Sequence, residues 1–190
     1  MVQTPTQSIT QKAFEQLCLE HPTRMFERTA QGELVEVSPV GGEGSSQEAD
    51  LITDVMIWNR QTKLGKVFSS QGAFRLPFGS IRAADVAWVR QERWEALTPE
   101  QQIGFPPVCP DFVIELRSQS IASGVIKPQS LPELRTKMAE YLASGLRLGW
   151  LINPQDQQVE IYRAGQAVQV VSMPTLLSGE AVLPGFELQV

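Results

Sequence analysis

The sequence predicts a single domain of the mixed α/β class that spans all 190 residues. Two segments, residues 46–63 and 131–144, repeat apolar side chains at helical spacing. Residues 110–118 contain a short apolar run bounded by a proline and by polar residues, which is typical of a buried strand. Residues 146–171 alternate around two turns and therefore indicate a β-meander. A chain of this length is within the usual size of one domain.

The composition excludes several classes of protein. Hydrophobic residues make up 42% of the chain and charged residues 19%, as in soluble globular proteins, and no apolar run approaches the ~20 residues of a membrane helix. The first residues lack the basic and apolar regions of a secretory signal, so we expect a cytoplasmic protein with flexible residues 1–9 and reduced cysteines. The single histidine disfavours zinc sites and histidine triads. A net charge of −5 argues against a broad basic surface but permits local basic clefts.

The first 38 residues predict one helix and one hairpin. Thr10 can cap a helix over residues 11–20. Residues 24–29 and 33–38 alternate on either side of a Gln-Gly turn, which predicts a β-hairpin. The glycine-rich residues 39–44 lack the Lys-Ser/Thr ending of a phosphate-binding loop. We therefore interpret them as a flexible connection, and the sequence indicates no organic cofactor.

The helix over residues 46–63 carries one acidic residue in an unexpected direction. Its apolar stripe runs through Leu51, Val55 and Trp58, and Gly65 is a plausible terminator. At about 100° per residue, Glu48 projects into the middle of that stripe. Its place in the first turn explains an acidic residue near the helix N-terminus, but not the inward direction. Both a role in a site and simple dipole stabilisation remain open for Glu48.

Short strands are predicted next, at residues 66–69, 73–76 and 85–89, followed by a surface helix and turn over residues 92–100. Asp85 stands at the mouth of the third of these strands.

The second half of the chain begins with the buried strand and ends with the meander. Residues 118–130 are polar and predict an irregular connection. Ser130 and Glu133 form the pattern of a capping box for the helix that Gly145 ends. After the meander, residues 183–188 predict an edge segment.

Three charged residues then converge in the predicted fold. Glu115 lies inside the buried strand, Asp85 begins a neighbouring strand, and Lys137 flanks the apolar face of the next helix. A charge in a core strand is costly unless a partner or a metal compensates it. For the two acids the alternatives are solvation at a strand end or ion pairs with Arg82 or Arg117. For Lys137 the alternative is a solvated helix flank.

These residue types are those of metal-dependent phosphodiester hydrolysis. Two carboxylates on neighbouring strands can share a Mg²⁺ or Mn²⁺ ion, and the carbonyl of Leu116 could supply a third protein ligand. A lysine beside the ion can orient or deprotonate the attacking water and offset charge on a phosphate. The spacing alone does not decide the matter, because such triplets arise readily by chance.

At these residues the chain resembles a known family. The motifs are Ala-Asp-Val-Ala-Trp-Val at 84–89, Pro-Asp-Phe-Val-Ile-Glu-Leu-Arg-Ser at 110–118, Leu-Arg-Thr-Lys-Met-Ala-Glu-Tyr-Leu-Ala-Ser-Gly at 134–145 and Arg-Leu-Gly-Trp-Leu-Ile-Asn-Pro at 147–154. They are similar to those of the Uma2 family (DUF820) of restriction-endonuclease-like proteins, a family abundant in cyanobacteria. The similarity covers residues 32–186, nearly the whole chain. The resemblance implies a PD-(D/E)XK nuclease fold, with a mixed central sheet flanked by helices.

The resemblance also implies roles for individual residues. Asp85 matches the family's first metal-binding aspartate and Glu115 its second carboxylate. Where this fold usually has a lysine, the chain has Arg117, which cannot act as a base near neutral pH. The resemblance suggests that Lys137 replaces that lysine from the helix. Glu48 corresponds to a helix carboxylate often present in the fold.

Two loops depart from the family pattern. Ala84 replaces the proline that usually precedes the aspartate, and residues 118–121 depart from the usual Ser-Pro-Ser-Asp/Glu stretch. Neither change removes an expected ligand, but both alter loops beside the site.

The function that we expect is a Mg²⁺- or Mn²⁺-dependent endonuclease acting on DNA. Arg82 and Arg117 could contact phosphates. A homodimer joined through the meander would present the two sites needed to cut two strands. The alternatives are a catalytically inactive binding or regulatory module of the same fold, and a hydrolase of small phosphodiesters, which would better suit the acidic chain.

Overall fold

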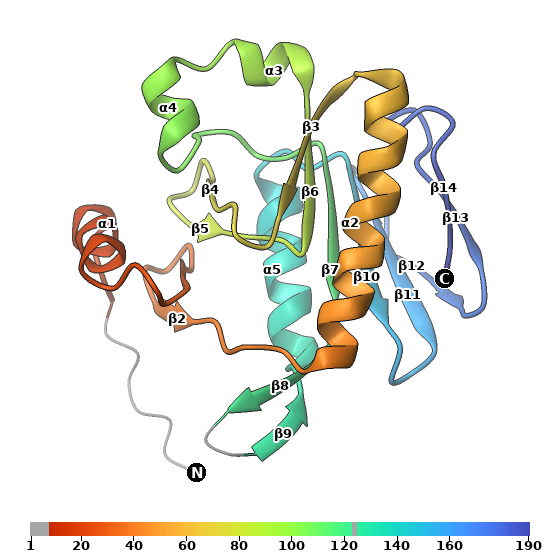
Figure 1. The fold of residues 1–190 in the computed structure, drawn as a ribbon, viewed down its shortest axis with the longest axis horizontal. Coiled ribbons are helices and arrows are strands. Elements are labelled where there is room, and N and C mark those ends of the chain that lie inside the picture. The colour runs from red at the N-terminus through yellow and green to blue at the C-terminus, as the bar shows by residue number, and fades with distance from the viewer. Residues whose placement is uncertain (1–7, 123–124) are drawn as a thin grey trace.

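A computed structural model of the chain describes residues 8–122 and 125–190. Figure 1 shows its elements, which are, in chain order, α1 (Gln11–Glu20), β1 (Phe26–Arg28), β2 (Leu34–Glu36), α2 (Gly42–Thr62), β3 (Gly65–Ser69), β4 (Phe74–Arg75), β5 (Ile81–Arg82), β6 (Val86–Arg90), α3 (Gln91–Glu95), α4 (Pro99–Ile103), β7 (Phe112–Leu116), β8 (Gln119–Ala122), β9 (Val125–Pro128), α5 (Leu131–Ala143), β10 (Leu148–Asn153), β11 (Gln158–Arg163), β12 (Gln169–Ser172), β13 (Leu176–Ser178) and β14 (Glu187–Gln189).

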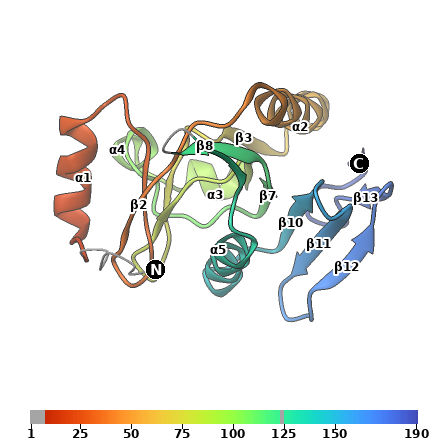
Figure 2. The ribbon, with the colours of Figure 1, turned by 90° about the horizontal axis from the view of Figure 1, so that it is seen from below.

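A six-stranded sheet in the order β12-β11-β10-β7-β6-β3 forms the centre of the molecule. Strands β7 and β10 are parallel, and every other neighbouring pair is antiparallel. The sheet lies between α2 and α5, which cover opposite faces (Figure 2). These observations confirm the predicted mixed sheet flanked by helices, and β10 to β12 form the predicted C-terminal meander.

Each face of the sheet has its own apolar core. On one face, Leu51, Val55 and Trp58 of α2 pack against alternate residues of the central strands, including Trp88 and Trp150. The rings of Trp58 and Trp88 meet edge to face with centroids 5.7 Å apart. The other core joins a second set of buried side chains from α5 and the central strands: Leu134, Met138, Tyr141, Val113 and Leu151. Side chains that alternate along a buried strand thus supply both cores.

A second sheet, in the order β2-β1-β5-β4, lies beside the central one together with α1 (Figure 1). The predicted hairpin is confirmed as β1 and β2, and Thr10 caps α1 by accepting from the N–H of Ala13. Ser8 forms a β-bridge with Glu33, and Ile9 donates to the carbonyl of Gly32. Residues 1–7 lie outside the described part of the chain.

Helix α2 begins and ends at other residues than predicted. It starts at Gly42, inside the expected loop, with Gly41 in extended conformation as its N-cap. It ends at Thr62, and its C-cap, Lys63, adopts a left-handed conformation with φ 57°. Gly65 does not end the helix but opens β3. A Cβ at Gly65 would contact the carbonyl of Val89 and lie 2.5 Å from Cε2 of Trp88, so only glycine fits there.

The Gly65→Ala variant is expected to lose ~1–3 kcal/mol of unfolding free energy, because the added methyl group overpacks a contact between backbone and indole. Urea unfolding measures the loss. Gly42→Ala is the matched control, since a Cβ there meets nothing within 4 Å and alanine favours a helix. Equal midpoints for the two variants would contradict the explanation.

Two further predictions in the second half of the chain are wrong. Residues 118–130 are not irregular, because β8 and β9 form a hairpin within them. Ser130 is the N-cap of α5, but its side chain makes no capping hydrogen bond, so the capping box is absent. The tail does form an edge segment, β14, which pairs with β13 in a separate two-stranded sheet. Phe186 and Leu188 of the tail pack into the core on the α2 side. Among the described helices, none is long and apolar enough to cross a membrane.

Candidate active site

Two of the predicted carboxylates lie side by side where β6 begins and β7 ends. Val86 pairs with Ile114 in this antiparallel ladder, and the next position along it sets Asp85 opposite Glu115. Oδ2 of Asp85 accepts a hydrogen bond of 2.6 Å from the N–H of Leu116. Glu115 is only 2% exposed, which excludes solvation at a strand end. The sheet therefore holds both carboxylates at one place.

Lys137 reaches this place from α5. Its Nζ lies 2.8 Å from Oε1 and 3.1 Å from Oε2 of Glu115, and it donates a hydrogen bond of 2.6 Å to the carbonyl of Ala83. The side chain is 13% exposed, so Lys137 points into the site and not to solvent. The flank of α5 that carries Lys137 faces the place where β6 begins and β7 ends.

A third carboxylate, Glu27 of β1, was missed by the sequence reasoning. Its Oε1 lies 2.9 Å from Nζ of Lys137 and accepts from the N–H of Ala83 at 3.1 Å. Its Oε2 accepts from Arg82 at 2.9 Å, and the residue is 5% exposed. Phe26 and Glu27 are both buried, and nothing in the local sequence indicates that β1 is buried on both faces.

Arg82 is buried in ion pairs with carboxylates. Its Nε and Nη2 donate to both oxygens of Glu140 at 2.7 and 2.9 Å, and its Nη1 donates to Glu27. The contact with a phosphate that we expected for Arg82 would require this buried network to open.

Arg117 is likewise engaged elsewhere. It donates to Asn153 at 3.2 Å and to Asp156 at 3.1 Å, at the turn after β10, and its Nε donates to the carbonyl of Gln129. Among the described residues, the ion pairs of Arg82 and Arg117 are with carboxylates other than Asp85 and Glu115.

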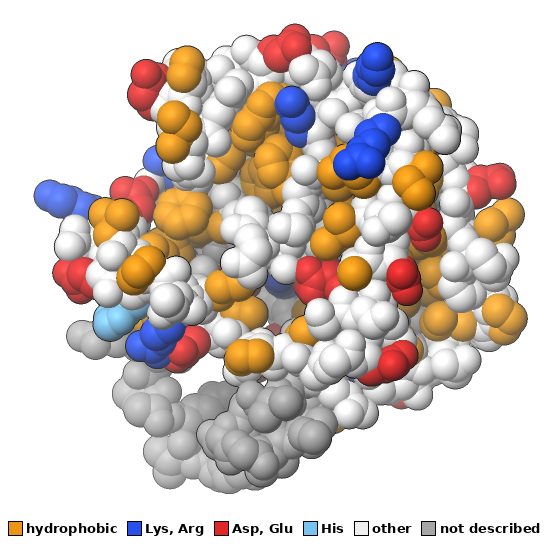
Figure 3. All heavy atoms as spheres, viewed as in Figure 1, with side chains coloured by type: hydrophobic (Ala, Val, Ile, Leu, Met, Phe, Trp, Pro, Cys, Tyr) orange, Lys and Arg blue, Asp and Glu red, His pale blue; other side chains and the backbone are white. Residues whose placement is uncertain are grey.

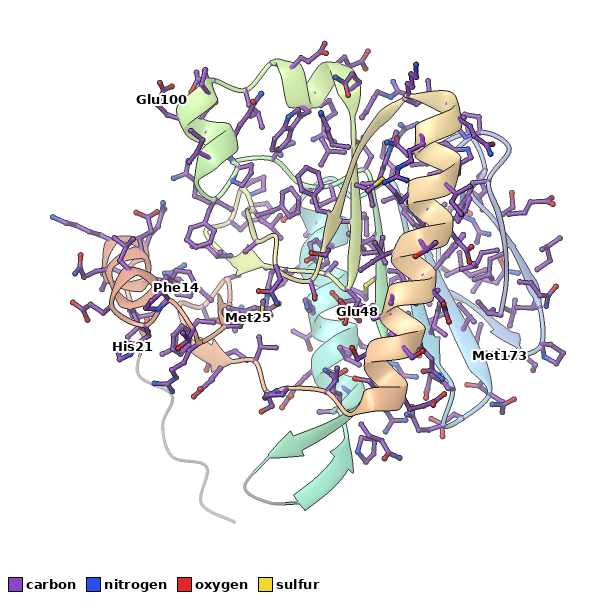
Figure 4. The ribbon with its side chains drawn as sticks, in the orientation of Figure 1. Phe14, His21, Met25, Glu48, Glu100 and Met173 are labelled. Carbon is purple, nitrogen blue, oxygen red and sulfur yellow. The ribbon has the colours of Figure 1, made fainter. Side chains whose placement is uncertain are left out.

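Glu48 lies on the side of α2 that faces the centre of the molecule (Figure 4). It is partly buried, and its Oε1 accepts a hydrogen bond of 2.6 Å from the hydroxyl of Ser70. Its charge is one of those that raise the pKa of Asp85. The inward direction predicted for Glu48 is confirmed, and the residue stands at the rim of the site.

The site holds more negative than positive charge. Five carboxylates (Glu27, Glu48, Asp85, Glu115 and Glu140) face two cations, Lys137 and Arg82. Acidic side chains also gather around a hollow near the centre of this face and along the lower half of α2 (Figure 3). The site therefore favours the binding of a further cation.

The pKa values follow from burial and this charge imbalance. Burial raises the pKa of Glu115 to about 8 and that of Asp85 to about 6, although Lys137 opposes both shifts. Burial alone would also raise the pKa of Glu27, but Lys137 and Arg82 outweigh it and hold that pKa below its usual range. Burial would lower the pKa of Lys137, but Glu115 and Glu27 raise it above its ordinary value. Lys137 is therefore a cation at neutral pH.

The donor set fits a hard divalent cation. Both carboxylate oxygens of Glu115 are within 3.1 Å of Nζ of Lys137, and the side chain is buried. All the candidate ligands are oxygens, as Mg²⁺ and Mn²⁺ prefer. In residues 8–122 and 125–190, no cluster of three or more His, Cys, Asp or Glu side chains is arranged around a metal position. An ion here would thus rely on two carboxylates, a backbone carbonyl and water, which is the usual way of binding Mg²⁺.

In the metal-free protein, stability is expected to fall as the pH rises from about 4.5 to about 8. Across this interval folded Glu115 keeps a proton that the unfolded chain has released. The stabilisation is therefore complete below the ordinary pKa and is lost as the pH passes through the raised one. One such proton changes the unfolding free energy by at most ~1.4 kcal/mol per pH unit. The raised pKa of Asp85 also makes the unfolding free energy fall with rising pH, up to about pH 6.

Thermal unfolding in EDTA, measured across this pH interval, tests the expectation. Glu115→Gln cannot ionise at this position and should flatten the slope. Parallel slopes for the wild type and the variant would show that another group is responsible.

Comparison with known proteins shows the family of the chain and the likeness of its fold. A family model, Uma2, described as "Putative restriction endonuclease", matches residues 12–190. The chain belongs to the Uma2 family. Among solved structures, the Uma2 chain is similar to a "putative nuclease belonging to DUF820" from Anabaena variabilis ATCC 29413, with a TM-score of 0.74 and 19% identity over 95% of this chain and 94% of that one. No match was found among curated proteins. Membership of Uma2 supports a restriction-endonuclease-like nuclease, and the structural likeness supports its fold.

Proposed function

We propose that this Uma2 protein is a Mg²⁺- or Mn²⁺-dependent endonuclease that hydrolyses phosphodiester bonds in DNA. The observation that carries the proposal is the contact of Lys137 with the buried carboxylate of Glu115, which lies directly across the sheet from Asp85. A buried acid with a raised pKa beside a second acid and a lysine is expensive for the fold. Such strain is typical of a functional site.

Asp85 and Glu115 would hold the ion, and the carbonyl of Leu116 is the third protein ligand that we propose. Bound there, a divalent cation polarises a phosphoryl oxygen and lowers the pKa of a bound water. The N–H of Leu116 holds one oxygen of Asp85, which leaves the other oxygen of that carboxylate available. The backbone of β7 thus orients the carboxylate from the neighbouring strand.

Lys137 orients the attacking water and offsets charge on the phosphate. Its raised pKa favours this role over that of a base, because an ammonium group cannot accept a proton. Glu48 is the partly exposed carboxylate at the rim, and we propose that it holds a water at the entrance to the site.

The proposed substrate is DNA, consistent with the family's description as restriction endonuclease. A homodimer would present two such sites to the two strands of a duplex. The edge strand of the meander, β12, exposes Val170 to solvent and carries no charged residue, and Val168, directly before the strand, is also exposed. An edge strand of this kind is suited to pair with a second copy.

A specific observation also favours a hydrolase of small phosphodiesters. The site is rich in carboxylates, its cations are already paired, and the net charge of the chain is −5. A long polyanion would meet repulsion at such a site unless metal ions compensate it.

Incubation with supercoiled plasmid, a structured RNA and bis(4-nitrophenyl) phosphate, each with Mg²⁺, with Mn²⁺ or with EDTA, separates the candidates. Nicking or linearisation of plasmid that requires the ion supports the endonuclease. Turnover of the small ester alone supports the second candidate. If none of the three substrates is turned over with either ion, the catalytic proposal fails and the fold serves as a binding module.

A further inference from the structure

The backbone N–H and the backbone carbonyl of Ala83 are both held by residues of the site. Its N–H donates to Oε1 of Glu27 at 3.1 Å, and its carbonyl accepts from Nζ of Lys137 at 2.6 Å. Ala83 is buried and stands two residues before Asp85. The backbone that delivers Asp85 to the mouth of β6 is therefore fixed by these two side chains.

Glu27 also holds Lys137 directly. The same Oε1 that binds the backbone lies 2.9 Å from Nζ of Lys137, which also contacts Glu115. The other oxygen of Glu27 accepts from Arg82, whose remaining donors bind Glu140. A continuous chain of ion pairs thus fixes the carboxylate of Glu27, and that carboxylate fixes the ammonium group of Lys137.

We propose that Glu27 is a positioning residue of the active site. It holds Lys137 against Glu115, and through Ala83 it sets the place of Asp85. This role rests on the proposed function, because it concerns the arrangement of the two metal-binding carboxylates and of the lysine. It assigns the β1–β2 hairpin, which lies outside the central sheet, to the machinery of the site. Partners of this kind, one shell behind the ligands, typically change metal affinity or activity by ~10–100-fold when removed.

A purely structural ion pair is the competing explanation, and the chain offers a matched control for it. Glu140 is also a largely buried carboxylate that pairs with Arg82, with an exposed fraction of 11% against 6% for the side chain of Glu27. Replacing either carboxylate with an amide removes one ion pair from Arg82. Only Glu27 contacts Lys137 and Ala83, so a difference between the two variants isolates the positioning role.

The experiment compares Glu27→Gln with Glu140→Gln in the full chain. Mn²⁺ binding is measured by titration calorimetry, and plasmid cleavage is measured as a function of plasmid concentration. For Glu27→Gln we expect the Mn²⁺ dissociation constant to rise by ~10–100-fold and kcat to fall, with KM for plasmid nearly unchanged. For Glu140→Gln we expect Mn²⁺ affinity within ~3-fold of the wild type, since that residue touches neither Asp85 nor Lys137.

Each outcome decides the matter. A folded Glu27→Gln protein that binds Mn²⁺ as the wild type does overturns the inference alone, and so does an equal loss in both variants. If Glu27→Gln does not fold, Glu27→Asp replaces it, because it keeps the charge but withdraws the carboxylate by one methylene. Failure of both to fold makes Glu27 a structural residue and overturns the inference. A wild-type protein that binds no Mn²⁺ overturns the proposed function itself, and the inference with it.

Discussion

Replacing Glu115 with Gln is expected to slow metal-dependent cleavage of plasmid DNA by at least ~10³-fold, and Asp85→Asn is expected to do the same. A bound ion supplies several kcal/mol of stabilisation where charge develops, and each ~1.4 kcal/mol corresponds to a factor of ten in rate. An amide keeps the shape of each side chain but is a poor ligand for a hard cation. Single-turnover cleavage with excess enzyme measures the effect on the chemical step.

Glu160→Gln is the matched control for these variants. Glu160 is also a buried acid of the central sheet, two strands from Glu115, but its partners are Arg135 and Tyr162. Its variant is expected to cut at nearly the wild-type rate. Cutting that persists unchanged in both Asp85→Asn and Glu115→Gln would remove these residues from the mechanism.

The fold should not suffer from the Glu115 change. At a pH above about 8 the buried carboxylate is charged at a cost to the fold, and Gln removes that cost. We therefore expect the unfolding temperature of metal-free Glu115→Gln at that pH to equal or exceed that of the wild type. Loss of activity without loss of stability identifies a residue retained for function.

The opposite result is expected for Arg82→Met. Arg82 joins Glu27 and Glu140 through buried contacts, and its removal leaves Glu140 without its cation and Glu27 with Lys137 as its remaining cation. Breaking a buried ion pair in this way typically costs ~3–5 kcal/mol of unfolding free energy. Urea unfolding at constant pH, with the slope of the transition compared between proteins, measures the loss.

Arg24→Met provides the contrast for that experiment. Arg24 pairs with Glu36 on the surface, where both side chains are about half exposed, so its loss should leave the midpoint unchanged within error. If Arg82→Met unfolds at the same urea concentration as Arg24→Met, the buried network contributes nothing to stability.

The sequence was sufficient to predict the elements that have a regular pattern of apolar residues. The stripe of Leu51, Val55 and Trp58 places α2 on the sheet, and the apolar run of β7 is fully buried as expected. Asp85, Glu115 and Lys137 were found because each stands on or directly before a regular element, so its direction follows from that element.

Long-range contacts account for what could not be predicted. Glu27 owes its place in the site to Lys137 and Arg82, which are 110 and 55 residues away along the chain. The β8–β9 hairpin lacks the apolar alternation that reveals a strand. The prediction of a capping box for α5 was wrong because the sequence pattern specifies residue types and not side-chain geometry. Gly65 was mistaken for a helix terminator because the contact that requires glycine there, with the indole of Trp88, comes from another strand.

The contact between Glu27 and Lys137 also bears on how small a working fragment of this protein can be. The central sheet and its two covering helices begin only at Gly42, which suggests that the first 41 residues could be trimmed away. A fragment trimmed there would retain Asp85, Glu115 and Lys137 but would expose Arg82 and Lys137 without the carboxylate between them. The smallest competent unit of this nuclease-like fold therefore includes the hairpin, and truncation, domain fusion or splitting of the chain should spare it.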